Sequence, residues 1–192
     1  MEFAKQTVVI TGASSGIGAA IARELAPRVG RLILVARRED RLRVLADELS
    51  VPCDVEPCDL ADRHALSKLA DRLATREIDG FVNNAGLGSS GCTWTTEEDR
   101  LHAMLDVNVR ALVVLTRRIV PGMVERGRGF VFNVGSIAGV QPVPFMAVYA
   151  ATKSFVNHFS EALASELEGT GVWCGVLCPG STRTEFFDVA EV

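Results

Sequence analysis

The stretch that decides the fold is Thr7-Val8-Val9-Ile10-Thr11-Gly12-Ala13-Ser14-Ser15-Gly16-Ile17-Gly18. Its first four residues are β-branched and present no polar face, which is typical of a strand buried inside a parallel sheet. A helix is predicted directly after it, from residue 19 to about residue 26. Strand, glycine turn and helix are together the context of a dinucleotide-binding turn. In such a turn Gly12 permits the tight bend, Gly16 lets the backbone approach a pyrophosphate, and Gly18 lets the helix pack close to the strand.

Apolar runs of the same kind recur along the chain and alternate with helical segments. Further strands are predicted at residues 32–35, 51–56, 78–82, 129–134 and 172–178, and further helices up to about residue 49 and at 62–74, 97–126 and 147–167. Asp62 is the expected N-terminal cap of the helix at 62–74. The helix at 97–126 is expected to bend or break near Asp106. This alternation predicts an α/β fold of the Rossmann type, a doubly wound parallel sheet with strand order 3-2-1-4-5-6 and helices on both faces. We expect residues 1–192 to form a single domain.

The end of the second predicted strand indicates which cofactor the turn binds. NAD sites usually carry an acidic residue there for the ribose hydroxyls, but this chain has Ala36 followed by Arg37 and Arg38. A carboxylate would repel a 2′-phosphate, whereas a guanidinium can pair with it through two hydrogen bonds. We therefore expect NADP in preference to NAD, with Arg37 as the first candidate for the 2′-phosphate and Arg38 as the second. The alternative is that both belong to the solvated face of the next helix.

A rare phenol and a rare amine lie one helical turn apart near the start of the helix at 147–167. Tyr149 is the only tyrosine of the chain, and Lys153 is one of three lysines. Residues four apart share a helix face, and a nearby ammonium lowers the pKa of a phenol. The spacing therefore predicts a proton donor and acceptor that works near neutral pH. The alternative is an ordinary helix face with a half-buried ring and a solvated charge.

Charge and composition narrow the classes of function. The net charge is −4 and no basic stripe is present, so nucleic-acid binding is not expected. The apolar runs are too short to span a bilayer, and the N-terminus shows no signal-peptide pattern, so we expect a cytoplasmic protein without a membrane segment. The five cysteines form no C-x-x-C pair, which argues against a disulfide framework. No histidine lies at zinc spacing beside them, so no metal site is expected.

The chain resembles the short-chain dehydrogenase/reductase family in six motifs that occur in the family's order and at its spacing. These are the glycine turn at 11–18, Asn83-Asn84-Ala85-Gly86, Asn108, Ser136, Tyr149 with Lys153, and Pro179-Gly180. The resemblance implies hydride transfer between a carbonyl and a secondary alcohol. It makes Tyr149 the general acid or base, Lys153 its partner on the nicotinamide ribose, Ser136 the group that polarises the carbonyl, and Asn108 the holder of a relay water.

Cofactor contacts are expected from a set of residues that lie on the strand-end turns. The set comprises Gly12, Ser14, Ser15, Gly16, Ile17, Gly18, Arg37, Arg38, Asp59, Leu60, Asn84, Ala85, Gly86, Tyr149, Lys153, Pro179, Gly180, Thr182 and Thr184. The loops at 87–96 and 140–146 are small and apolar, which favours a hydrophobic carbonyl or alcohol as substrate. By analogy with the family, a homodimer or homotetramer is expected.

Two further expectations follow from the comparison with the family pattern. The chain ends at Val192, whereas family members normally continue with a segment that covers the substrate and with a further strand. Either the sequence is part of a longer protein, or the protein lacks this segment and with it part of the pocket wall. The alternative function is a nucleotide-binding or sensing protein of the same fold without turnover. An epimerase or dehydratase is disfavoured by the glycine spacing.

Overall fold

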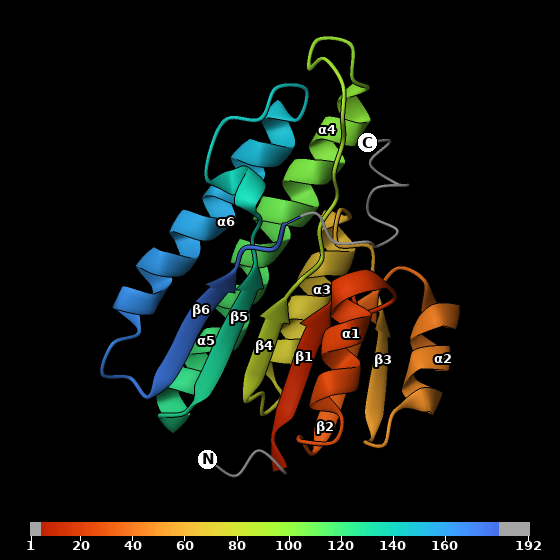
Figure 1. The fold of residues 1–192 in the computed structure, drawn as a ribbon. Coiled ribbons are helices and arrows are strands. Elements are labelled where there is room, and N and C mark those ends of the chain that lie inside the picture. Colours follow the sequence, from red (N-terminus) through yellow and green to blue (C-terminus); the bar gives the residue numbers. More distant parts are fainter. Residues whose placement is uncertain (1–4, 181–192) are drawn as a thin grey trace.

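The computed structural model of the chain describes residues 5–180, and these residues form one parallel sheet flanked by helices (Figure 1). The strands are β1 (Thr7–Thr11), β2 (Arg31–Ala36), β3 (Cys53–Pro57), β4 (Gly80–Asn83), β5 (Gly129–Val134) and β6 (Val172–Leu177). The helices are α1 (Gly16–Leu25), α2 (Glu39–Glu48), α3 (Arg63–Ala74), α4 (Glu98–Leu105), α5 (Leu112–Arg126) and α6 (Ala147–Glu166). All strand pairs are parallel and their order is β3-β2-β1-β4-β5-β6. The predicted fold class and strand order are confirmed.

Residues on the two sides of β1 explain why its sequence is apolar on both faces. Val8 and Ile10 pack on one side with buried residues of α1 and α2, whereas Val9 packs on the other side with residues of α3 and α5. Figure 1 shows α1 and α2 in front of the sheet and α3, α5 and α6 behind it. Because side chains alternate along a strand, a strand covered on both faces needs apolar residues at every position.

The helical region between β4 and β5 changes its winding where a bend or break was predicted. The chain passes from α4 into a π-helical segment, Asp106–Ala111, and then into α5 without leaving the helix. Wider π turns are rare and frequently mark functional positions. Here the turn contains Asn108, whose side chain is almost fully buried.

Two local predictions can be compared directly with the structure. The Asp62 carboxylate caps α3 as predicted, because its Oδ1 accepts hydrogen bonds from the backbone N–H groups of His64 and Ala65. The first helix begins at Gly16 rather than at residue 19, so the last two glycines of the turn lie within its first turn. The helix can start this early because Gly18 has no side chain. A Cβ there would lie 2.4 Å from the Gly12 carbonyl oxygen.

Candidate active site

The turns at the carboxyl ends of the strands line one cleft with a cavity volume of about 720 Å³. Within residues 5–180 the cleft contains every predicted site residue except Gly18 and Asn108, and Thr182 and Thr184 lie outside the described residues. The lining residues named in the prediction are Gly12, Ser14, Ser15, Gly16, Ile17, Arg37, Arg38, Asp59, Leu60, Asn84, Ala85, Gly86, Ser136, Tyr149, Lys153, Pro179 and Gly180. Segments up to about 170 residues apart in sequence therefore meet at one sheet edge, as parallel topology requires.

The glycine turn is held against the end of β4 by hydrogen bonds. Asn84 Nδ2 donates to the carbonyl oxygens of Thr11 (2.9 Å) and Gly12 (3.2 Å). In return, the Thr11 hydroxyl oxygen accepts from the backbone N–H groups of Asn84 (3.0 Å) and Ala85 (3.1 Å). Gly12 has a φ of 67°, and a Cβ there would lie 2.8 Å from the Ala85 Cα. Only glycine fits this crossing, and Asn84 has a structural task there in addition to lining the cleft.

Of the two candidate arginines, Arg38 is the one that contacts the glycine turn. Its Nη2 donates to the hydroxyl oxygens of Ser15 (2.8 Å) and Ser14 (3.2 Å), whereas Arg37 is exposed. Both line the cleft beside Ala36. β2 ends at Ala36 without an acidic residue, and the cleft beside it carries two guanidinium groups and two hydroxyls, with Asp59 after β3 as the one carboxylate among the described lining residues.

Tyr149 and Lys153 are both buried on α6, with 8% and 5% of their surface exposed. The Lys153 Nζ donates to the carbonyl oxygen of Val134, at the end of β5, over 2.8 Å, and lies 5.9 Å from the centre of the Tyr149 ring. Ser136 forms a hydrogen bond with Tyr149, and its Oγ also accepts from the Ala138 backbone N–H over 3.1 Å. A phenol, a hydroxyl and an ammonium thus meet at one point of the cleft.

Burial shifts the pKa values of this pair, and for the phenol the shift is opposite to the prediction. Loss of hydration raises the pKa of Tyr149, and the hydrogen bond from Ser136 offsets only part of this rise. Loss of hydration also lowers the pKa of Lys153 to about 8. The spacing correctly placed the two side chains together. It did not account for the cost of a phenolate in a buried site, or for an ammonium directed at the Val134 carbonyl.

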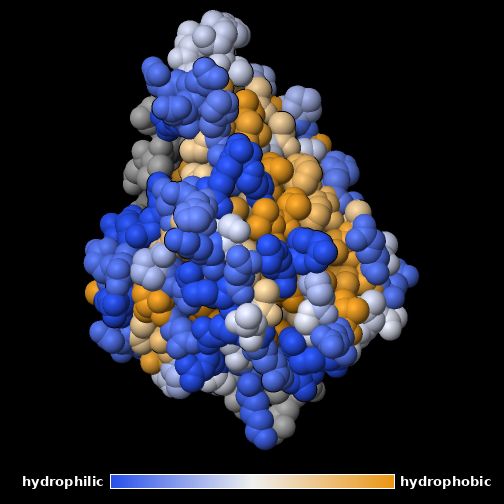
Figure 2. Space-filling view, turned by 180° about the vertical axis from the view of Figure 1, so that it is seen from behind, coloured by the Kyte–Doolittle hydropathy of each residue, from blue (hydrophilic) through white to orange (hydrophobic). Residues whose placement is uncertain are grey.

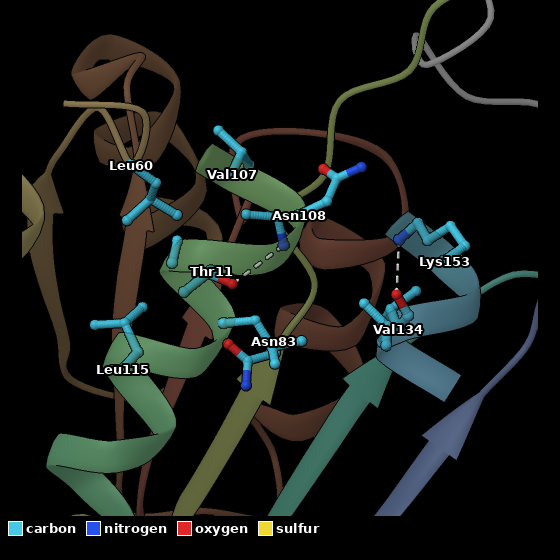
Figure 3. Close-up of a pocket in the computed structure, with 12 residues that line it drawn as sticks. Thr11, Leu60, Asn83, Val107, Asn108, Leu115, Val134 and Lys153 are labelled. Carbon is cyan, nitrogen blue, oxygen red and sulfur yellow. Dashed lines mark hydrogen bonds between the residues drawn. The ribbon is translucent and has the colours of Figure 1, made fainter. Parts of the chain in front are cut away.

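Asn108 ties the π turn to the neighbouring segments. Its Oδ1 accepts from the Leu87 backbone N–H (2.8 Å), and its Nδ2 donates to the Leu87 carbonyl (2.9 Å) and to the Thr152 hydroxyl (2.9 Å). Asn108 and Lys153 border a small cavity of about 10 Å³, which is close to the least volume that can hold one water. Figure 3 shows this cavity and the hydrogen bond from Lys153 to Val134.

Three residues at this site were missed by the sequence reasoning. Thr11 joins the two nucleotide-side turns, Thr152 joins Asn108 to α6, and Asn157 Nδ2 donates to the Ser136 carbonyl oxygen over 3.2 Å. Asn157 could have been found, because it lies four residues after Lys153 and therefore on the same helix face. Thr152 has no comparable signal, since threonine is common in strands and helices alike. Thr11 belongs to the glycine-turn motif, but the motif does not indicate its bonds to Asn84 and Ala85.

Metal, disulfide and membrane features can be described for the same part of the chain. Within residues 5–180 no three side chains of His, Cys, Asp or Glu are grouped so that they could hold a metal ion. All five cysteines are free thiols. Among the described helices, none combines the length and apolar character that a membrane crossing requires.

Comparison with known proteins gives consistent matches over most of the chain. The model of the short chain dehydrogenase family matches residues 6–191. Sulfoacetaldehyde reductase 2 of Chromohalobacter salexigens is 40% identical over 93% of this chain and 73% of its own length. The NADP-dependent 3-hydroxy acid dehydrogenase of Salmonella typhi is 40% identical over 95% of this chain and 75% of its own length. The curated relatives are in general longer than this chain, which spans 60 to 75% of their lengths.

A solved structure agrees with the described fold. The short-chain dehydrogenase from Sphingobium yanoikuyae in complex with NADPH superposes with a TM-score of 0.93 at 36% identity, covering 97% of this chain and 76% of that one. The family model, the relatives and the solved structure agree, and the chain belongs to the short chain dehydrogenase family of oxidoreductases.

Proposed function

We propose that the protein interconverts a hydrophobic carbonyl compound and the corresponding secondary alcohol, with NADP(H) as hydride carrier and Tyr149 as the proton-transfer group. The observation that carries this proposal is the meeting of Ser136, Tyr149 and Lys153 in one cleft, beside a glycine turn. A protein that only bound a nucleotide would not need a buried phenol hydrogen-bonded to a hydroxyl at the far end of the cleft.

The residues present fit a phosphorylated dinucleotide. Gly12 and Gly16 have positive φ values of 67° and 54°, which leaves the backbone of the turn open to a pyrophosphate at the N-terminus of α1. Arg38, held beside Ser14 and Ser15, and the exposed Arg37 supply positive charge where a 2′-phosphate would lie. The similar Sphingobium protein holds NADPH. These observations support NADP over NAD, with Arg38 in the better position.

Each residue of the proposed catalytic group has a task that its surroundings suit. The bound nicotinamide cofactor would supply or accept the hydride. Because burial raises its pKa, Tyr149 is protonated at neutral pH and can donate to a carbonyl oxygen, which favours reduction. Ser136 would polarise the same oxygen through its hydroxyl. Lys153 would bind the nicotinamide ribose, and Asn108 would hold a relay water in the small cavity it shares with Lys153.

The substrate end of the cleft supports an apolar substrate. The segments that follow β4 and β5 contribute mainly apolar side chains to the cleft, namely Leu87, Ile137, Val140, Val143 and Met146, beside the polar Gln141. Arg37, Arg38 and Lys153 are the cations among the described lining residues, and the two arginines lie at the opposite end. An uncharged, hydrophobic carbonyl compound therefore suits this wall better than a carboxylate or a sulfonate.

Self-association is proposed through the helices behind the sheet. Apolar side chains of α4, α5 and α6 are partly exposed there, among them Leu105, Val113 and Phe155. Figure 2 shows hydrophobic surface on this side of the molecule. A homodimer or homotetramer that buries these helices would remove that surface from water.

The test is NADPH oxidation against a panel of carbonyl compounds. Hydrophobic ketones, sulfoacetaldehyde and 3-oxo acids are compared at equal concentration, with NADH in parallel and Tyr149→Phe as the inactive control. We expect turnover of hydrophobic ketones, at least 10-fold better with NADPH than with NADH. Binding of NADPH without turnover of any carbonyl compound would instead favour the nucleotide-binding alternative.

A further inference from the structure

The face of α6 that carries Tyr149 and Lys153 continues one turn further with a third buried polar residue. Asn157 follows Lys153 at the same four-residue spacing, and 8% of its surface is exposed. The three side chains therefore form a stripe along one helix face. Tyr149 and Lys153 are accounted for by the proposed reaction, whereas Asn157 is not.

The contacts of Asn157 join the two segments that flank the reacting end of the cleft. Its Nδ2 donates to the Ser136 carbonyl oxygen over 3.2 Å, and its Oδ1 accepts from the Cys178 Sγ over 3.3 Å. One turn earlier, the Lys153 Nζ donates to the Val134 carbonyl oxygen. Two donors on successive turns of α6 thus hold the carbonyl groups on either side of Gly135.

Gly135 is shaped to receive the Asn157 amide. A Cβ on Gly135 would lie 2.0 Å from Asn157 Oδ1 and 3.2 Å from its Cγ, so any side chain would displace the amide. The next nearest atom, Cγ2 of Val176, would be 3.1 Å away and could give way by a few tenths of an ångström. The Asn157 amide therefore packs directly against the backbone of Gly135, and this contact is possible only while position 135 has no side chain.

We propose that Asn157 is a positioning residue that holds Ser136 at the distance from Tyr149 that proton transfer requires. The inference rests on the proposed function. The amide group carries a donor and an acceptor side by side, so it can donate to a carbonyl and accept from a thiol at once. Without it, the Ser136 carbonyl oxygen keeps the backbone N–H of Gly139 as a partner (3.0 Å) but loses the Asn157 amide. The backbone that directs the Ser136 hydroxyl is then held less firmly against α6. The hydrogen bond between Ser136 and Tyr149 then weakens.

The experiment compares Asn157→Ala with a matched control on the same helix. Ser160 is also buried, and its Oγ accepts from Asn133 Nδ2 of β5 (2.8 Å) and donates to the Val156 carbonyl oxygen (2.6 Å), so its bonds run to the sheet and to its own helix. We expect Asn157→Ala to lower kcat about 10-fold to 100-fold, since misplacement by about 1 Å can cost that much, with the KM for NADPH changed less than about twofold. The acidic limb of kcat/KM for alcohol oxidation should move to higher pH. Ser160→Ala should lower stability and leave these kinetic quantities unchanged.

A readout that needs no turnover comes from the single tyrosine. Protein labelled with ζ-¹³C-tyrosine gives one resonance, which belongs to Tyr149 and responds to the hydrogen bond at its hydroxyl. We expect Asn157→Ala to move this resonance and Ser160→Ala to leave it in place. If wild-type protein turns over no carbonyl compound, the proposed function fails, but the resonance still decides whether Asn157 positions Ser136.

A second variant guards against misfolding of Asn157→Ala and tests the contact with Gly135. Gly135→Ala should reproduce the loss of kcat in the wild-type background and add little in the Asn157→Ala background, where the amide is gone. Additive losses would overturn the proposal. Equal effects of Asn157→Ala and Ser160→Ala on kcat and on the resonance would also overturn it, because they would mean that Asn157 only stabilises the fold.

Discussion

Replacing Lys153 by methionine should change the pH dependence of the stability of the cofactor-free protein. Lys153 is buried, and loss of hydration lowers the pKa of its ammonium from 10.5 to about 8, with only the nearby Cys178 opposing. At about 1.4 kcal/mol per pKa unit, the folded state holds this charge at a cost of roughly 3 kcal/mol relative to the unfolded chain. Methionine has similar length and carries no charge.

The sign of the effect follows from the proton balance. Between pH 8 and pH 10.5 the unfolded chain keeps a proton on Lys153 that the folded protein has released, so the contribution of this residue to stability rises with pH. Its full cost is present below pH 8 and has disappeared above pH 10.5. Relative to Lys153→Met, the wild type should gain roughly 1 kcal/mol between pH 7 and pH 9, and roughly 2–3 kcal/mol by pH 10.

The wild type must be compared with the variant, because buried thiols change the stability of both proteins with pH in the opposite direction. Burial raises the pKa values of Cys58 and Cys174 to about 11, so both take stability away as the pH rises above 9. These contributions are the same in wild type and variant and cancel in the difference. The lost hydrogen bond from Lys153 to the Val134 carbonyl oxygen adds a constant that does not depend on pH.

The assay is urea unfolding at half-unit steps from pH 7 to pH 10, in the absence of nucleotide, with stability obtained by linear extrapolation. Lys68→Met is the matched control, because Lys68 is exposed on α3. The difference between wild type and Lys153→Met should change with pH more steeply than the difference between wild type and Lys68→Met. If the two differences follow the same course, the burial of the Lys153 charge has been misjudged and the reasoning is refuted.

Three further predictions concern turnover, cofactor choice and stability. Tyr149→Phe should abolish turnover while changing NADPH affinity by less than about twofold; equilibrium binding and NADPH oxidation measure both, and a variant with most of its activity would end the assignment. Arg38→Ala should lower the ratio of kcat/KM for NADPH to that for NADH by about 10-fold or more, and Arg37→Asp should shift it in the same direction; an unchanged ratio in both would place the 2′-phosphate elsewhere. Gly139→Ala should lower stability by about 1–3 kcal/mol in urea unfolding, because its Cβ would lie 2.5 Å from the Lys153 carbonyl carbon, and wild-type stability would show that the turn can move away from α6.

The fold was predictable because its signals are local and repeated. An apolar run in the sequence indicates each buried strand. The turn at Gly12 needs glycine for reasons of backbone geometry alone. Parallel strands joined by right-handed crossovers then bring the strand ends to one edge, so the position of the cleft followed without knowledge of any contact. The cap at Asp62 was predictable for the same reason, since its partners lie two and three residues away.

The details of the site could not be predicted, because they depend on side-chain direction. The sequence ranks Arg37 before Arg38, yet Arg38 is the residue that reaches Ser14 and Ser15. Helical spacing brings Lys153 close to Tyr149, but it does not show that the ammonium is directed at the end of β5. Periodicity fixes which residues share a face, whereas the partner of each polar group is fixed by the tertiary fold.

Burial connects the stability of this site with its proposed chemistry. The same loss of hydration raises the pKa of Tyr149 and lowers that of Lys153, so in the cofactor-free protein it opposes the charged form of each. In water, charges at this separation would be screened, whereas in a buried site their interaction is several-fold stronger. A phenolate formed at Tyr149 would therefore be stabilised by the Lys153 ammonium far more than the same pair on a surface. The stability that Lys153→Met is expected to recover near pH 7 is thus the cost of holding a cation at the position where the proposed reaction would use it.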